Sequence, residues 1–359
     1  MNKLFTFFIV IGVFIPKIYS QKFVWSANFD TRFDNREYNS DINKSQTLFG
    51  AKLTPEIGIS REQNHSKLLI GISMIEEFGA KTFEKKPEML LYYHYNSSPY
   101  SVYTGRFSRK AIIGKYANAF FNDSVRFFDA NLDGVLLQYR KENGYVELAF
   151  DWDSRQSETR REKFMIFSSA LRKKQMIYGG YNFSMYHYAM VADGNGVVDN
   201  IWDNFSMYHY AMVADGNGVV DNIWVMPFIG IDLSGKTVFD KLSLEAGWLQ
   251  AFQNDRSNVG KYVKPGGVHI DAQIEKYTFG ISNTLFHGDS MMPYYERYGS
   301  GLYRGDAFYN TGEGIYNRLE LYWKPLQDKN MNFKVSSVHH YDGQRWSWQQ
   351  VASFSVSIQ

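Results

Sequence analysis

The chain has 359 residues, no cysteine and a net charge of +2, from 39 basic and 37 acidic residues. The absence of cysteine excludes disulfides, Cys-ligated metal sites and cysteine nucleophiles, and the balanced charge gives no argument for nucleic-acid binding. Aromatic residues reach 17%, yet the mean hydropathy is −0.38. This combination leaves a secreted all-β protein or an outer-membrane β-barrel as the main classes.

Residues 1–20 predict a secretory signal peptide. Lys3 supplies a positive start, an apolar run extends from Leu4 to Ile15, and Ser20 precedes a plausible cleavage site before Gln21. Such a run is too short to cross a bilayer as a helix. We therefore expect export and a mature chain that is one domain, residues 21–359.

Alternation of apolar and polar residues predicts β-strands along the mature chain. It is clearest in residues 22–34 (KFVWSANFDTRFD), 144–153 (GYVELAFDWD), 268–275 (VHIDAQIE) and 346–359 (WSWQQVASFSVSIQ). A period of two residues places one set of side chains on each face of a sheet. The segments read as strands begin near Phe23, Leu48, Ser66, Met89, Ser101, Leu132, Gly144, Lys163, Met176, Val219, Leu242, Val268, Tyr277, Tyr316, Met331 and Trp346.

The links between these segments alternate between short and long. Short links include 141–144 and 172–175, and long links include 35–46 and 76–88, whereas the last link, 341–345, is short where a long one is expected. Short periplasmic turns and long exterior loops are typical of bacterial outer-membrane barrels, which have even strand numbers. The prediction is an all-β, antiparallel up-and-down transmembrane barrel of about 16 strands.

One segment occurs twice: NFSMYHYAMVADGNGVVDNIW fills residues 182–202 and again 204–224. Two copies are fewer than a solenoid needs, and the residues between the two ADGNG turns are too few for two full strands. We interpret residues 182–224 as an enlarged exterior loop, with a barrel of 18 strands as the alternative. Because the two copies are identical, the repeat suggests a recent duplication or a sequence-assembly error. The DGNG stretches read as turns, so no metal or cofactor is expected.

The chain resembles the porin-like outer-membrane barrels of Gram-negative bacteria, particularly those of the Bacteroidota type. The resemblance rests on YSQ at 19–21, the alternating strands, the tight turn RKENGYVE at 140–147 and the terminal strand VASFSVSIQ at 351–359. It implies outer-membrane localisation, surrounding lipid, assembly by the barrel-assembly machinery and passage of small hydrophilic solutes. Homotrimers are common in that family. The chain departs from the pattern by ending in Gln359, where an aromatic residue is usual.

If the resemblance holds, the third exterior loop, residues 108–130, is the first place to look for a constriction. A lumen lined by Arg and Lys favours anions, and one lined by Asp and Glu favours cations. The alternatives are solvated surface charges on the loop and charges that pair with one another inside a filled lumen. The predicted pore-lining residues are Arg106, Arg109, Lys110, Lys115 and Arg126 at the loop, and Glu147, Asp151, Asp271, Glu275 and Arg318 on the walls.

The long exterior link 291–314 is rich in tyrosine. Tyr294, Tyr295, Tyr298 and Tyr303 could stack on a ligand at the barrel mouth, because tyrosine combines an apolar face with a polar end. The alternative is that these side chains cement the loop onto its neighbours.

Passive diffusion of small hydrophilic solutes is the function that these observations favour, with a non-conducting barrel whose exterior loops bind a ligand or surface as the alternative. A barrel-embedded hydrolase is the third reading. It would need a nucleophile, a base and an orienting group within reach of one another. No GxSxG motif and no obvious His/Ser/acid cluster is found, so the chain is not expected to be an enzyme.

Overall fold

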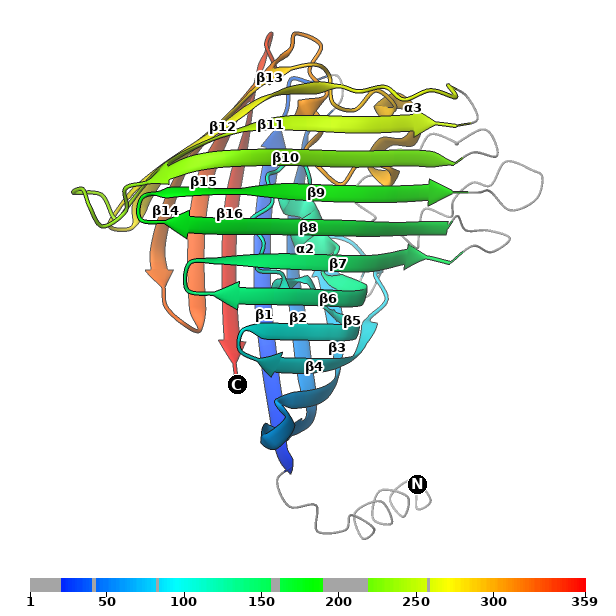
Figure 1. Cartoon of the computed structure of the whole chain (residues 1–359), viewed down its shortest axis with the longest axis vertical. Coiled ribbons are helices and arrows are strands. Elements are labelled where there is room, and N and C mark those ends of the chain that lie inside the picture. Colours follow the sequence, from blue (N-terminus) through cyan, green and yellow to red (C-terminus); the bar gives the residue numbers. More distant parts are fainter. Residues whose placement is uncertain (1–20, 41–42, 82–83, 156–161, 190–218, 257–258) are drawn as a thin grey trace.

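The computed structural model describes residues 21–359 apart from 41–42, 82–83, 156–161, 190–218 and 257–258. Sixteen antiparallel strands close into one barrel, with β1 paired to β16 (Figure 1). The predicted fold class is confirmed. The alternative of 18 strands is wrong, because β9 pairs directly with β10 and leaves no place for two more.

Each strand begins within two residues of its predicted start. The elements are β1 (Gln21–Glu37), β2 (Gln46–Arg61), β3 (Ser66–Glu77), β4 (Glu88–Ser97), β5 (Tyr100–Ser108), α2 (Asp123–Phe128), β6 (Asn131–Lys141), β7 (Gly144–Ser154), β8 (Glu162–Lys174), β9 (Ile177–Ala189), β10 (Val220–Asp232), β11 (Lys241–Asp255), β12 (Gly266–Lys276), β13 (Phe279–Gly288), α3 (Tyr295–Tyr298), β14 (Ile315–Gln327), β15 (Met331–Tyr341) and β16 (Trp346–Ile358).

The strands present an apolar face outward and a polar face to the lumen. Along β2, Phe49, Leu53 and Ile57 are exposed, whereas Lys52 and Glu56 between them are buried. Alternation of this kind is what a lipid-facing strand requires, because successive side chains point to opposite sides of the wall. Among the described residues, no helix is long and apolar enough to cross a membrane.

The connections are short at one end of the barrel and mostly long at the other. Residues 98–99, 142–143 and 277–278 are tight turns, whereas residues 109–130 and 289–314 are the two longest links outside the repeat. The short link 342–345 lies at the long-loop end, as the sequence indicates. The first residue of β1 and the last residue of β16 both lie at the end of the barrel that has the short turns.

The repeat contributes to two neighbouring strands. Residues 182–189 of the first copy belong to β9, and residues 220–224 of the second copy belong to β10, paired in register with Trp224 opposite Ser184. The remaining part, 190–218, lies outside the described residues, as does the predicted signal peptide. The interpretation as an enlarged loop therefore stays a prediction.

Candidate functional site

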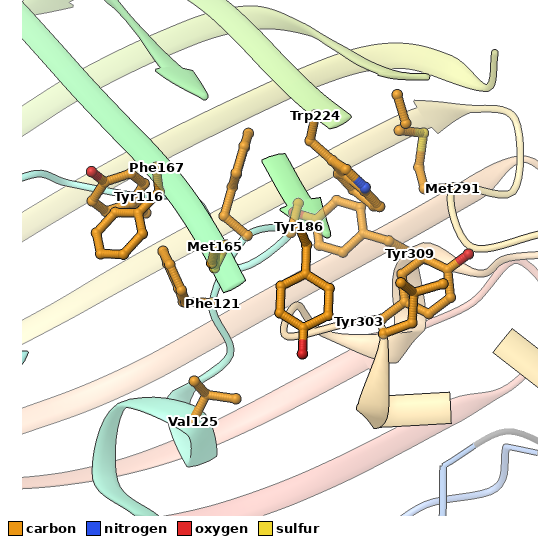
Figure 2. Close-up of a cluster of buried hydrophobic side chains, with 14 of the residues drawn as sticks. Tyr116, Phe121, Val125, Met165, Phe167, Tyr186, Trp224, Met291, Tyr303 and Tyr309 are labelled. Atoms are coloured by element: carbon orange, nitrogen blue, oxygen red, sulfur yellow. The ribbon is translucent and has the colours of Figure 1, made fainter. Parts of the chain in front are cut away.

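Two exterior loops fold back into the barrel and occupy part of its lumen. We call them the plug: residues 109–130, which contain α2, and residues 289–314, which contain α3. Most of their aromatic and apolar side chains form one buried cluster with inward-facing wall residues (Figure 2), and Phe127 and Phe128 form a smaller one with Ile75 of β3. Phe121 meets Phe167 of β8 edge-on at 5.2 Å between ring centroids, and Tyr309 lies 5.3 Å from Phe286 of β13. The third exterior loop, which the sequence analysis named as the first place to look for a constriction, lies inside the barrel.

The two halves of the plug are joined to each other. The backbone N–H of Asn122 donates to the carbonyl of Arg304 at 3.0 Å, and that of Asp306 donates to Asn118 at 2.8 Å. A Cβ at Gly305 would lie 1.9 Å from the carbonyl oxygen of Ala119. Only glycine permits this close approach of two backbones, so the two loops pack as one body.

Glu147 of β7 holds the first plug segment against the wall. This carboxylate is fully buried and accepts hydrogen bonds from the backbone N–H groups of Ile113 and Gly114, each at 2.9 Å. Nearby, Asn182 Oδ1 accepts from Ala117 N at 3.0 Å. A predicted pore-lining residue is thus engaged in anchoring the plug, because a buried carboxylate is costly unless hydrogen-bonded.

A buried ion-pair network joins both halves of the plug to β7. Arg109 pairs with Asp129 at 3.0 Å and with Asp151 of β7. Arg304 pairs with the same Asp129 and with Asp153 of β7. Burial alone would raise the pKa of Asp129, but the guanidinium groups of Arg109 and Arg304 outweigh it and lower that pKa. The sequence analysis named two of these five charged residues, Arg109 and Asp151, and only the fold brings all five together.

A second charged cluster surrounds Arg318 of β14 on the other side of the plug. Its guanidinium lies 3.0 Å from Glu320 Oε2 and 3.4 Å from Asp123 Oδ2 of α2. His340 and Asp306 line the same space. The cavity enclosed here has a volume of about 40 Å³, which is room for a few water molecules and not for a nutrient-sized solute.

The other basic loop residues are placed as follows. Lys110 Nζ pairs with Asp30 Oδ1 of β1 at 2.7 Å, and Arg126 donates to the Tyr116 carbonyl at 2.8 Å. Lys115 is tied through its backbone, where Asn182 Nδ2 donates to its carbonyl at 3.1 Å. Lys110 thus pairs with a charged group, as in the alternative in which lumen charges pair with one another, whereas Lys115 and Arg126 are exposed.

The pore-lining prediction does not hold for Arg106, whose side chain lies on the outer face of the wall. It pairs with Asp133 of β6, and both side chains are on the outer face of the wall, since their neighbours Phe107 and Leu132 are the ones buried inward. Alternation along β5 decides this, because Phe107 and Arg106 point to opposite sides.

The acidic residues predicted on the far wall are also paired within it. Asp271 accepts from Thr284 Oγ1, and Glu275 accepts from Tyr322 at 2.9 Å and from Lys324 at 2.7 Å.

The tyrosines of the second plug segment point inward and are not displayed at a mouth. Tyr298 Oη donates to Asp255 Oδ2 and Tyr303 Oη to Gln253 Oε1, each at 2.6 Å, and Tyr294 is likewise buried. Tyr295 packs beside Tyr303 with ring centroids 6.0 Å apart. These contacts agree with the alternative interpretation, in which the tyrosines attach the loop to its neighbours.

Acid should loosen the plug. Burial works against ionisation of Asp123, but Arg318, Arg32 and Arg126 lower its pKa below the ordinary 3.8, and Asp129 is lowered likewise. A lowered folded-state pKa contributes stability above 3.8 that is lost as the pH falls through the folded value. Burial raises the pKa of Asp306, so this carboxyl acts in the opposite direction. It is one carboxyl against two, Asp123 and Asp129. We expect current fluctuations in planar bilayers to appear below about pH 4, and Asp129→Asn to bring them at neutral pH. A quiet trace at acid pH would contradict this.

Sequence reasoning missed Arg304, Asp129 and Asp153, the centre of the network. Asp153 could have been found, since it continues the inward series Glu147 and Asp151 along β7. Arg304 carries no such signal, because it lies in a loop. Within the described ranges, no group of three or more His, Asp or Glu side chains is arranged to hold a metal ion.

Comparison with known proteins gives a family and a fold. The family model described as Lipid A 3'-O-deacylase-type matches residues 20–359. None of the curated proteins matches. Among solved structures, a loop-deletion mutant of the Vibrio cholerae outer-membrane protein OmpT is similar with a TM-score of 0.54 and 8% identity, over 94% of this chain and 100% of that one. Pseudomonas putida OprB matches with a TM-score of 0.48 and 10% identity, over 94% of each chain.

These findings bear differently on the predictions. The likeness to OmpT shows the fold, a porin-like outer-membrane barrel. The family match overturns the expectation that the chain is not an enzyme, since the family is an enzyme family. The expectation failed because it rested on missing sequence motifs, whereas side chains that act together in a barrel come from separate strands.

Proposed function

Because this chain belongs to the Lipid A 3'-O-deacylase-type family, we propose that it hydrolyses an acyl ester of lipid A in the outer membrane. The observation that carries the proposal is the extent of the match, residues 20–359, which covers all sixteen strands and both plug segments. The reaction consumes water and yields a free fatty acid and a lipid hydroxyl group.

The packing of the plug inside the lumen supports this proposal over transport. Aromatic packing and ion pairs occupy space that a solute would need, and the cavity beside Arg318 has a volume of only about 40 Å³. The outer wall, by contrast, offers a broad apolar surface to lipid, with Phe23, Ile57 and Ile229 more than half exposed. A barrel with this arrangement is suited to a substrate that reaches it through the membrane.

The test is incubation of the refolded mature barrel with purified lipid A in detergent, followed by mass spectrometry of the lipid and the released fatty acids. We expect loss of one acyl group with gain of one hydrogen, and a matching free fatty acid. Protein unfolded by boiling is the control. An unchanged lipid A mass after prolonged incubation with folded barrel would contradict the proposal.

Passive diffusion of small hydrophilic solutes is the second candidate, and strand number is the observation that favours it. Sixteen strands enclose a lumen wide enough for an aqueous channel when loops do not fill it. A non-conducting barrel that binds a ligand or surface through its exterior loops is consistent with the plug and remains an alternative. Export by the signal peptide, the Bacteroidota type and trimer formation remain predictions.

A further inference from the structure

An apolar groove lies on the outer face of the barrel wall, across β12 to β16. Its volume is about 650 Å³, which is within the range of roughly 300–1,000 Å³ of small-molecule sites. The exposed apolar side chains that line it are Ile274, Phe279, Ile281, Leu321, Trp323 and Val335. A hollow in a membrane-facing wall can hold one lipid more tightly than a smooth surface does, because the lipid contacts the wall on more than one side.

Strand register gives the groove its direction and length. Two rows of outward-facing side chains run across the strands, and each row consists of residues directly opposite one another: Phe279, Trp323 and Val335 in the first, and Ile281, Leu321, Ser337 and Gln350 in the second. From β12 to β16 the distance is roughly 19 Å, since neighbouring strands lie about 4.8 Å apart. The groove is therefore long enough for an extended fatty acyl chain.

The wall is irregular beside the first row. Between the pair Trp323–Val335 and the pair Leu326–Phe333, β14 has one residue more than β15. Pro325 lies in this bulge, and proline has no N–H group to donate to the neighbouring strand. A bulge bends the strand that contains it and increases its twist. The first row of the groove thus lies where the wall departs from a regular sheet.

Lys276 is the one charged side chain among the described residues that line the groove. It is the last residue of β12, at the short-turn end of the barrel, and it is half-buried. Its ammonium group donates to the Val238 carbonyl and lies 4.7 Å from the centroid of the Tyr277 ring. An ammonium group has three N–H donors. These contacts therefore hold Lys276 in position and leave donors for a phosphate oxygen.

The link between β10 and β11, residues 233–240, borders the groove beside Lys276. It is the longest link at the short-turn end, and Phe239 from this link lines the groove. The link packs against the end of β12, because Asp240 N donates to the Glu275 carbonyl at 2.9 Å and Asp240 Oδ2 accepts from Tyr277 N. Aromatic side chains beside a lysine are typical of the membrane–water interface, so this end of the groove is placed at the level of lipid headgroups.

We propose that the groove binds one phospholipid of the inner leaflet, with its phosphate at Lys276 and one acyl chain along the two rows. The short turns of such a barrel face the periplasm, and the inner leaflet of a bacterial outer membrane consists of phospholipid. The single charge in the lining is positive and complements a phosphate group. This inference goes beyond the proposed function and does not depend on it, because it requires only a barrel embedded in a membrane.

Photo-crosslinking locates the lipid. The folded barrel is placed in vesicles of phosphatidylethanolamine and phosphatidylglycerol that contain a trace of phosphatidylglycerol with a diazirine on its acyl chain. After irradiation, peptide mass spectrometry maps the adducts. We expect adducts on the outer face of β13 to β15 to exceed those on the outer face of β6 and β7 at least about fivefold. Equal labelling of the two faces would show that the groove holds only bulk lipid and would overturn the proposal.

Lys276→Gln tests the phosphate contact. Native mass spectrometry counts the phosphatidylglycerol molecules that remain bound after transfer of the barrel from vesicles to detergent. Loss of one lysine near a membrane surface should reduce this retention about fivefold. Lys141→Gln is the matched control, because Lys141 also ends a strand at the short-turn end and lies 5.5 Å from a tyrosine ring, that of Tyr139, but is outside the groove. Equal retention by the two variants, in protein whose gel band still shifts on heating, overturns the phosphate assignment.

Val335→Trp tests the acyl-chain contact. The larger side chain should obstruct the first row and reduce the retained phosphatidylglycerol at least about tenfold, since several methylene groups lose their apolar contacts. Val135→Trp, the same change on the outer face of β6, is the control and should leave retention unaltered. An equal effect of both substitutions would show that the groove does not hold the chain. A dimer in the native mass spectrum that Val335→Trp abolishes would assign the groove to a second copy of the chain and overturn the lipid.

Discussion

Replacing residues 291–312 by a short Gly–Ser turn should convert a barrel that passes little current into an open pore. This segment carries Met291, Tyr303 and Tyr309 of the buried cluster and the guanidinium of Arg304. Its ends are already joined, since Gly288 N donates to the Gly314 carbonyl at 2.9 Å, so β13 and β14 can be closed by a tight turn. A lumen of sixteen strands without this filling is wide enough for water and ions.

Single-channel conductance in planar bilayers measures the effect. We expect at least about a tenfold increase in mean conductance over the intact chain. Removing residues 235–238, an exposed turn at the opposite end of the barrel, is the control and should change nothing. Stable open steps from the intact chain, equal to those of the variant, would revive passive diffusion as the function.

Arg304→Ala should be the most destabilising single substitution in the plug. Arg304 bonds Asp129 of the other loop and Asp153 of β7, and its side chain is 17% exposed. Removing one member of a buried ion network leaves uncompensated charge, which costs about 3–5 kcal/mol. Arg304 also stacks over Tyr186 with its guanidinium 5.6 Å from the ring centroid, so packing is lost as well.

The measurement is urea unfolding of the detergent-folded barrel, followed by the heat-dependent shift of its gel band. Arg256→Ala is the matched control, because Arg256 forms an ion pair with Asp221 while its side chain is 56% exposed. An exposed pair contributes at most about 1 kcal/mol. Equal losses for the two variants would show that the buried network does not hold the plug.

The alternation of apolar and polar residues was enough to predict the barrel, because the face of a strand on which a side chain lies follows from the local sequence. Residues 268–275 and 346–359 each show which side chains point outward without reference to any other part of the chain, and both segments form strands in the structure. The same rule, applied strictly, would also have placed Arg106 on the outer face. That error was one of application, because the information was present in the sequence.

Contacts between distant segments were decided only by the tertiary structure. Arg304 and Asp153 are 151 residues apart, and no pattern within either segment indicates the other. The direction of a loop depends on what it can bury, and here the loop apolar groups find partners such as Phe167 and Phe286 only once the wall has closed. The sequence by itself therefore determined the strands, their faces and their number, since these follow from short-range periodicity. The packing of the plug inside the lumen arises from strand register and long-range contacts, which no local pattern specifies.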